Sequence, residues 1–171
     1  GVPYFLEALA LLREKRDDFV LEIVGDGPNR AEYEELTRKL GLQEVVRFHG
    51  LKTKQEVAEF MRKADVFVLP SEWENLPCVI IEAMASGLPI VATNVGGIPE
   101  IVDDEVGVLI PAKNITRLAE ALDFTLNSLS TFVPDRIAAR ARERFSYDAV
   151  GKMLDSLYRS VVRNPPVARG L

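Results

Sequence analysis

The sequence predicts one α/β domain with a Rossmann-like, three-layer fold, in which a parallel sheet lies between two layers of helices. Short apolar runs alternate with segments of helical spacing along most of the 171 residues. The runs are mostly continuous in their apolar character, as strands that are covered on both faces require. Strands that alternate with helices are joined by right-handed crossovers, which make the strands parallel.

The predicted elements follow one another with short connections. The strands are expected at residues 19–24, 45–48, 65–69, 90–93 and 106–110. The helices are expected at residues 2–16, 29–40, 53–63, 77–86, 99–102, 114–128, 134–145 and 147–162. Thr53 and Glu56 match a capping box at the start of the third helix. Gly41 and Gly87 stand where a glycine ends the second and fourth helices.

The two ends of the domain are expected at unusual places. Because the chain enters a helix directly at Gly1, we expect that the first strand of the domain is missing from this sequence. The domain is then expected to cover residues 1–163, and residues 164–171 are expected to form a flexible tail.

Composition argues against several classes of protein. The formal net charge is −5 and the pI is about 5.1, whereas a nucleic-acid-binding protein should show a basic patch. One cysteine permits no intrachain disulfide, and one histidine argues against a histidine-rich metal site. The Asp-x-Asp pattern that commonly holds a nucleotide-bound divalent ion does not occur, so no metal is expected. No apolar run is long enough to span a bilayer.

The stretch SEWENLPCVIIEAMASG, residues 71–87, carries the strongest functional signal. It reads as a buried helix, and an unpartnered buried carboxylate such as Glu82 is costly. Glu74 precedes Pro77, a residue that favours a helix start. The free N–H groups there and the helix dipole would form an anion site between two carboxylates, which suits a sugar nucleotide. The alternative, which periodicity alone leaves equally open, is that both carboxylates face water.

Other candidate residues follow from the rule that ligands bind outside the carboxyl ends of parallel strands. Four segments occupy such ends: Gly25-Asp26-Gly27, His49-Gly50-Leu51, residues 70–76 and residues 94–97. The first resembles a dinucleotide fingerprint. However, Arg30 stands at its third glycine position, so a tight turn near the cleft is the favoured interpretation.

Three further residue types in these segments have alternative interpretations. Gly96 and Gly97 suit an anion-binding nest, but a tight turn into a helix is favoured. His49 has no triad arrangement around it, so a hydrogen-bonded histidine at a strand end is preferred to a cleft residue. Trp73 would contact a sugar or base, or form a lid, and the sequence does not separate these roles.

The region from residue 65 to residue 102 resembles a known family. Its sequence, DVFVLPSEWENLPCVIIEAMASGLPIVATNVGGIPEIV, is similar to the signature of retaining GT-B glycosyltransferases of the "group 1" family. VGDGP, FHG and FSYDAVGKMLDSLY extend the resemblance over nearly the whole chain. The spacing Glu-x(7)-Glu from Glu74 to Glu82 is a weak match alone, but the order and the neighbouring residues make it specific.

The resemblance implies a role for the residues around the first carboxylate. Glu74 would be the catalytic residue that contacts hydroxyls of the transferred sugar, and the amides of Asn75 and Leu76 would hold the diphosphate. Many family members have Gly-Phe-Gly after this glutamate, where the present chain has Asn75-Leu76-Pro77. Because Pro77 has no N–H, the set of amides that reaches the phosphate differs.

The resemblance also implies a nucleotide site. Glu82 would bind the ribose hydroxyls, and the loop at Gly50 and Leu51 would border the base. The donor would be a UDP-, GDP- or ADP-sugar, and no metal cofactor is expected. The family places an Arg and a Lys against the diphosphate just before the position of Gly1, so both cations are absent from the sequence shown.

The implied enzyme moves a hexose to an acceptor with retention of configuration, and this chain would be its donor-binding half. The N-terminal acceptor-binding domain is missing, so the fragment alone is expected to be inactive. The acceptor would be a glycan, a lipid or a small molecule. The full enzyme is expected in the cytoplasm, or peripheral at the inner membrane face. A sugar-nucleotide epimerase of related fold and a non-catalytic nucleotide-sugar-binding module are the alternatives.

Overall fold

The computed structural model describes residues 1–163, and the tail expected at residues 164–171 lies outside this range. The strands are β1 (Leu21–Ile23), β2 (Val46–Phe48), β3 (Phe67–Leu69), β4 (Ile90–Thr93) and β5 (Gly107–Ile110). The helices are α1 (Val2–Arg13), α2 (Arg30–Lys39), α3 (Lys54–Lys63), α4 (Cys78–Ala85), α5 (Ile115–Asn127), α6 (Pro134–Phe145) and α7 (Tyr147–Arg163), with 3-10 turns η1 (Ile98–Glu100) and η2 (Leu129–Thr131). The alternation predicted from the sequence is confirmed, although most strands are shorter than expected.

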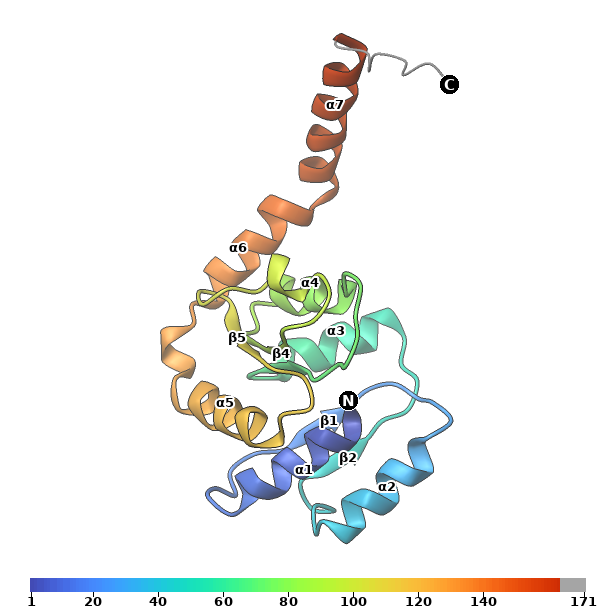
Figure 1. Ribbon diagram of the computed structural model, residues 1–171, viewed down its shortest axis with the longest axis vertical. Helices are drawn as coiled ribbons and strands as arrows, with labels where there is room; N and C mark the ends of the chain where they lie inside the picture. Colours follow the sequence, from blue (N-terminus) through green and yellow to red (C-terminus); the bar gives the residue numbers. More distant parts are fainter. Residues whose placement is uncertain (164–171) are drawn as a thin grey trace, which may run out of the picture.

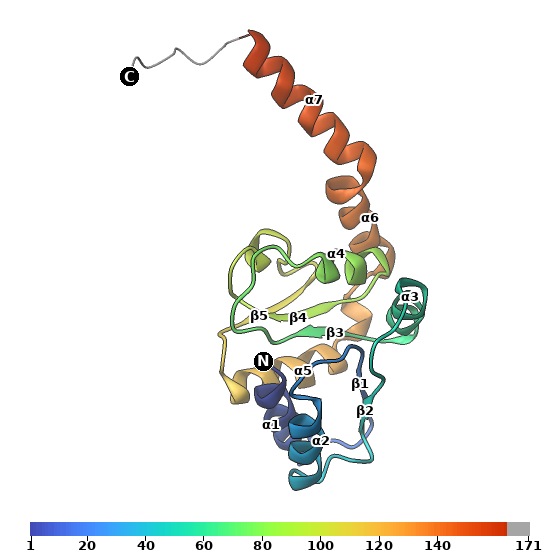
Figure 2. The ribbon, with the colours of Figure 1, turned by 90° about the vertical axis from the view of Figure 1, so that its right-hand side faces the viewer.

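The strands are parallel, as predicted, but they form two sheets. β1 pairs with β2, and the order in the second sheet is β3-β4-β5. Figures 1 and 2 both show the β1-β2 pair to one side of the larger sheet, and in Figure 2 β3 is the strand of that sheet nearest to it. The sequence predicted one parallel sheet and did not predict this division.

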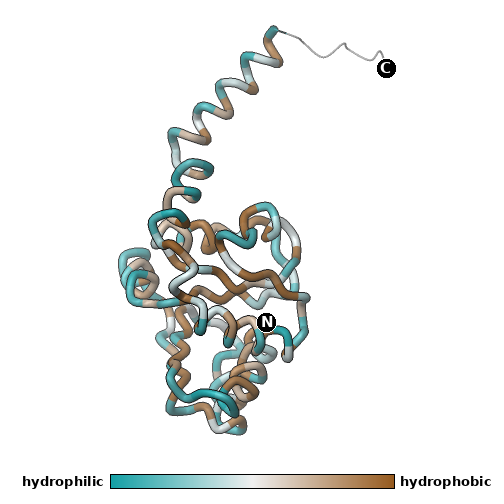
Figure 3. Tube along the Cα trace, turned by 90° about the vertical axis from the view of Figure 1, so that its left-hand side faces the viewer, coloured by the Kyte–Doolittle hydropathy of each residue, from teal (hydrophilic) through white to brown (hydrophobic). Residues whose placement is uncertain are grey.

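Helices cover the larger sheet on both faces, and the packing creates two hydrophobic clusters. The first cluster joins α1, α2 and α5 to strands of both sheets, and its buried α1 residues are Phe5, Leu6, Ala8, Leu9 and Leu12. The second cluster joins α3, α4 and α6 to the larger sheet. β4 is buried at all four positions because it lies between two strands and under helices on both faces. In the hydropathy colouring of Figure 3, the strands of the larger sheet are mainly brown.

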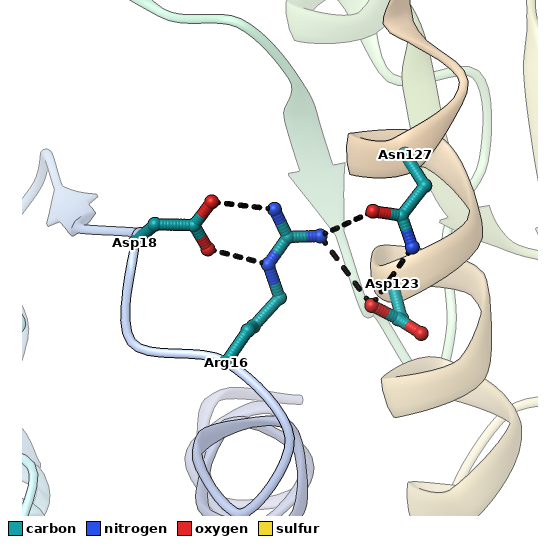
Figure 4. Close-up of polar contacts among 4 residues, drawn as sticks. All are labelled: Arg16, Asp18, Asp123 and Asn127. Carbon is teal, nitrogen blue, oxygen red and sulfur yellow. Dashed lines mark hydrogen bonds and ion pairs between the residues drawn. The ribbon is translucent and has the colours of Figure 1, made fainter.

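A polar network fastens the end of α1 to α5 (Figure 4). The Arg16 guanidinium donates two hydrogen bonds to the Asp18 carboxylate, at 2.6 and 2.9 Å. It also donates to Asp123 at 3.4 Å and to Asn127 at 3.2 Å, both on α5. The guanidinium holds the pKa of Asp18 below its ordinary value. These hydrogen bonds hold the turn after α1 against α5, which packs in the same hydrophobic cluster as α1.

The predicted helix ends are confirmed where local geometry decides them. Thr53 and Glu56 form both hydrogen bonds of the capping box at α3. Gly41 and Gly87 adopt left-handed φ values of 69° and 81° after α2 and α4. The N–H of Gly87 donates to the carbonyl oxygen of Met84 at 2.8 Å, which satisfies one of the last carbonyls of α4.

The last helix, α7, extends away from the body of the domain (Figure 1) and has no buried residue. Its larger apolar residues recur at helical spacing along one stripe: Val150, Met153, Leu154, Leu157 and Val161. Two ion pairs, Asp148–Lys152 and Asp155–Arg159, lie on the opposite side by the same periodicity. In residues 1–163, no helix is both long and apolar enough to cross a membrane.

Candidate functional site

The loops after β3 and β4 meet at the carboxyl edge of the larger sheet. The Thr93 hydroxyl donates to the carbonyl oxygen of Ser71 at 2.6 Å. The Ser71 hydroxyl in turn donates to the Glu74 carboxylate at 2.7 Å. The N–H of Gly97 donates to the carbonyl oxygen of Asn75 at 2.6 Å. The backbone around Glu74 is therefore held by the neighbouring strand and by the loop that follows that strand.

Glycines allow these two loops to touch. A Cβ atom at Gly96 would lie 1.9 Å from the carbonyl oxygen of Glu74, and one at Gly97 would lie 2.7 Å from that of Asn75. Gly96 also has a left-handed φ of 53°. Both glycines thus serve the close approach of the loop that carries Glu74.

The two carboxylates singled out by the sequence have different surroundings. Glu74 is half-buried in the loop before α4 and accepts the Ser71 hydrogen bond. Glu82 is exposed on α4, and among residues 1–163 its carboxylate has no hydrogen bond or ion pair. The expectation of a buried carboxylate at position 82 is wrong. The buried residues of α4 lie on one face, at Ile80, Ala83 and Met84, and Glu82 points away from that face.

The N-terminus of α4 is bordered by exposed residues of the preceding loop. Pro77 is buried and precedes the first helical residue, Cys78, so the helix begins one residue later than expected. Within residues 1–163 the first turn has no side-chain cap. The N–H of Ile80 donates to the carbonyl oxygen of Pro77 at 3.2 Å, whereas those of Cys78 and Val79 have no side-chain partner there and are available to an anion. Trp73 and Leu76 beside it are 81% and 45% exposed, and Asn75 is exposed as well.

The loops after β1 and β2 form a second group at the carboxyl ends of the smaller sheet. The N–H of Gly25 donates to the carbonyl oxygen of Gly50 at 2.9 Å. Gly50 is buried with a φ of 66°, and Leu51 beside it is 80% exposed. A cavity of about 390 Å³ opens here. It is lined by Val2, Ile23, Val24, Gly25, Asp26, Gly27, Pro28, Asn29, Arg30, Tyr33 and Phe48.

His49 is engaged within the fold. Its Nε2 contacts the Glu22 carboxylate of β1, and its ring lies 4.5 Å from that of Phe60, between ring centroids. These contacts agree with the interpretation of a hydrogen-bonded histidine at a strand end.

The start of α1 lies between the two groups of loops. A Cβ atom at Gly1 would lie 1.7 Å from the carbonyl oxygen of Pro70, which follows β3. The next residue, Val2, lines the cavity that also contains Gly25 to Gly27. Both groups therefore border one helix end, with the loop of Glu74 on one side and the cavity on the other.

Lys113 forms a further contact that the sequence did not predict. Its Nζ lies 2.7 Å from the Glu72 carboxylate and 6.0 Å from the ring centroid of Tyr4. The ammonium holds the pKa of Glu72 below its ordinary value, and Glu72 raises the pKa of Lys113. Among residues 1–163, Lys113 is the only residue other than glycine with a positive φ, at 61°.

Sequence reasoning missed three residues that support the loop: Ser71, Thr93 and Lys113. Ser71 had a local signal, since it stands three residues before Glu74. Thr93 and Lys113 had none, because each contacts a segment more than 20 residues away. Within residues 1–163, no group of three or more His, Cys, Asp or Glu residues is arranged to hold a metal ion.

Comparison with known proteins identifies relatives for most of the chain. A family model described as "Glycosyl transferases group 1" matches residues 1–144. The chain is 30% identical over 164 residues to alpha-D-kanosaminyltransferase of Streptomyces kanamyceticus. It is 35% identical over 155 residues to the putative colanic acid biosynthesis glycosyltransferase WcaL of Escherichia coli. These matches cover 94% and 86% of this chain, which spans 42% and 38% of the two relatives.

Solved structures share the fold. Sucrose-phosphate synthase from Thermosynechococcus elongatus matches with a TM-score of 0.78 and 29% identity, over 92% of this chain and 42% of its own. Anabaena HepE, solved in complex with UDP, matches with a TM-score of 0.78 and 24% identity, over 91% and 44%. At that identity the second match shows the fold alone. The predicted Rossmann-like half of a GT-B fold is confirmed.

Proposed function

Because the chain belongs to the group 1 glycosyltransferase family, we propose that it is the donor-binding part of a retaining hexosyltransferase that uses a nucleoside-diphosphate sugar. The observation that carries the proposal is the position of Glu74. Its carboxylate is held by Ser71 at the carboxyl end of β3, directly before the uncapped first turn of α4. This edge of a parallel sheet is where ligands of such folds bind.

In this proposal the protein accelerates the reaction by electrostatic stabilisation of the leaving diphosphate. The amides of Asn75 and Leu76 and the first N–H groups of α4 face the diphosphate and stabilise the negative charge that develops as it leaves. Glu74 accepts hydrogen bonds from the hydroxyls of the transferred sugar. The Ser71 hydrogen bond leaves one of its carboxylate oxygens without a partner among the described residues, available to a sugar.

The nucleoside would lie against the other carboxylate. The Glu82 carboxylate accepts hydrogen bonds from the ribose, and its exposure makes it accessible to a ligand. Gly50 and Leu51 border the base in this proposal, beside the cavity that contains Gly25 to Gly27. The complex of Anabaena HepE with UDP supports a nucleotide donor for a chain of this fold.

The full enzyme would contain more than this domain. Because the chain spans 38–42% of the two curated relatives, we propose that an acceptor-binding domain completes it. The family match disfavours the sugar-nucleotide epimerase and the non-catalytic module.

Calorimetric titration of the 171-residue chain with UDP, GDP and ADP tests the donor site. One diphosphate should bind more tightly than its own nucleoside monophosphate, since the proposed amides contact both phosphates. Equal affinity for the two, or no binding of any diphosphate, would contradict the proposal. A Glu143→Ala variant is a suitable control, because Glu143 is exposed on α6. Its affinity should equal that of the parent.

A further inference from the structure

The turn that follows β1 contacts a side chain that the proposed donor site does not use. Arg30 is the first residue of α2 and stands at the third position of the motif Gly25-x-Gly27-x-x-Arg30, where dinucleotide-binding folds have a glycine for close helix packing. Its Nη1 donates to the Asp26 carboxylate at 3.5 Å, and its Nη2 donates to the carbonyl oxygen of Phe48 at 3.4 Å. One side chain therefore connects α2 to the turn after β1 and to the end of β2.

The guanidinium of Arg30 lies directly against Gly50. A Cβ atom at Gly50 would lie 3.0 Å from Arg30 Nη1 and 3.7 Å from an Asp26 carboxylate oxygen. The N–H of Gly25 donates to the carbonyl oxygen of Gly50 at 2.9 Å, so the same turn also holds the backbone of Gly50. Gly50 is buried with a left-handed φ of 66°, and the chain continues from it to Leu51, which is 80% exposed. The direction in which this loop leaves β2 therefore depends on the turn and on Arg30.

Two carboxylates keep the guanidinium in this orientation. Glu34, one turn further along α2, accepts a hydrogen bond from Nε at 2.8 Å, and Asp26 contacts the guanidinium from the turn. The hydrogen bond to Glu34 is the main cause of a raised pKa of Arg30, so the guanidinium stays charged. Its five N–H donors form a planar fork that serves Glu34, Asp26 and the Phe48 carbonyl at once. A lysine has one charged centre on a flexible stem and cannot reproduce this geometry.

We propose that Arg30 is a positioning residue, which fixes the loop of Gly50 and Leu51 and thereby sets the preference of the donor site among nucleobases. The inference rests on the proposed function, in which this loop borders the base. Discrimination between bases requires hydrogen-bonding groups that match one base edge, and a loosely supported site loses that match. The groups proposed for the diphosphate and the ribose lie elsewhere, at residues 75–76 and at Glu82 on α4. Arg30 should therefore affect the choice of base and leave the contacts with the diphosphate in place.

The test compares Arg30→Lys with Arg38→Lys in the 171-residue chain. Arg38 lies on the same helix with a side chain that is 58% exposed, and among residues 1–163 the only side-chain partner of its guanidinium is Glu35. Calorimetry gives the dissociation constants of UDP, GDP and ADP for the parent and both variants, and the ratio of the weakest to the tightest measures the base preference. A purely structural role of Arg30 would weaken all three diphosphates alike and leave this ratio unchanged.

A second measurement reports on the loop without any ligand. Hydrogen exchange is followed by NMR at the amide of Gly25, whose N–H donates to Gly50, with the amide of Val91 in central strand β4 as the reference.

In Arg30→Lys the ratio should fall toward one, by up to about tenfold, since losing a hydrogen bond to a charged group changes an equilibrium by about this factor. The amide of Gly25 should exchange faster relative to that of Val91, because the loop that accepts its hydrogen bond is released. Arg38→Lys should match the parent in both measurements.

An unchanged ratio or unchanged exchange at Gly25 in Arg30→Lys would overturn the inference without affecting the donor site, as would the same changes in Arg38→Lys. Equal affinity of the parent for the three diphosphates would overturn it too, since the site would then have no preference to set. If the parent binds none of them, the proposed function is itself contradicted and the inference fails with it.

Discussion

A 2.6 Å hydrogen bond joins the Thr93 hydroxyl to the carbonyl oxygen of Ser71, 22 residues earlier in the chain. Thr93 is 2% exposed at the end of β4, and Ser71 begins the loop that carries Glu74. The bond connects the most buried strand to the proposed sugar-binding carboxylate through a single intervening residue. The orientation of Glu74 therefore depends on a side chain in the core.

Thr93→Val should destabilise the domain by about 1–2 kcal/mol, because the Ser71 carbonyl loses its donor in a partly buried place. The matched control is Thr125→Val. The Thr125 hydroxyl is fully buried and has no hydrogen-bond partner within the described chain, so its removal should be neutral or stabilising. Urea unfolding of both variants measures the difference. Equal destabilisation would show that the Thr93 hydrogen bond contributes nothing specific.

Gly96→Ala should destabilise the domain more than Gly41→Ala. Both glycines have a left-handed φ, which costs a residue with a Cβ atom about 1–2 kcal/mol. The added Cβ atom meets nothing within 4 Å at Gly41, whereas at Gly96 it would lie 1.9 Å from the carbonyl oxygen of Glu74. Both variants carry the cost of the left-handed φ, so the difference between their melting temperatures reports the effect of the clash at Gly96. Identical melting temperatures would mean that the loop of Glu74 moves away freely.

Glu82→Ala should weaken binding of the nucleoside diphosphate about tenfold or more, since hydrogen bonds to a charged acceptor contribute about 1.5–3 kcal/mol. Glu74→Ala should leave affinity for the free diphosphate nearly unchanged and reduce the preference for its sugar-bearing form. Because Glu82 is exposed and unpaired in residues 1–163, its removal should leave the melting temperature unchanged. Calorimetry with both ligands checks these roles. If Glu82→Ala binds the nucleotide like the parent, the ribose assignment is wrong.

Lys113→Gly should be more stable than Lys113→Ala. Both variants lose the ion pair with Glu72, but only glycine adopts the φ of 61° without a steric cost. The ion pair also predicts a pH dependence. The pKa of Glu72 is lowered in the folded chain, so the pair stabilises the fold above the ordinary value of 4.5, and this stabilisation is lost as the pH falls through the lowered pKa. The urea midpoints of the parent and of Lys113→Ala should differ at neutral pH and converge in acid.

The amides of α7 should exchange faster with solvent than those of α6. None of the α7 residues is buried, whereas Ile137 and Ala141 anchor α6 to the core. Most of the stability of helices in proteins comes from tertiary packing of an apolar face, and the apolar stripe of α7 is not buried. Gly151→Ala should slow exchange in α7, because a helix-interior glycine costs about 0.5–1 kcal/mol and the added Cβ atom meets nothing within 4 Å. Exchange in α7 as slow as in β4 would show that a partner covers its apolar stripe.

The sequence by itself determined the order and type of the elements and several of their ends. The capping box of Thr53 and Glu56 and the terminating glycine at position 87 depend on residues within a few positions of each other. Such contacts form wherever the local backbone is helical, so local spacing is sufficient to predict them. The motif from Glu74 to Glu82 could be recognised for a similar reason, because its residues lie close together in the sequence.

Only the tertiary structure decided which groups are buried and which loops meet. The segment Cys78–Ala85 is apolar on most of its circumference, so its periodicity did not show that Glu82 faces outward. Packing of α4 against α6 and the sheet determines which face is buried. The contacts of Thr93 with Ser71 and of Lys113 with Glu72 depend on parallel strands that end at the same edge. The division of the sheet likewise depends on which strand edges find a partner. These outcomes follow from distances between segments remote in the chain, and residue spacing along the sequence does not contain those distances.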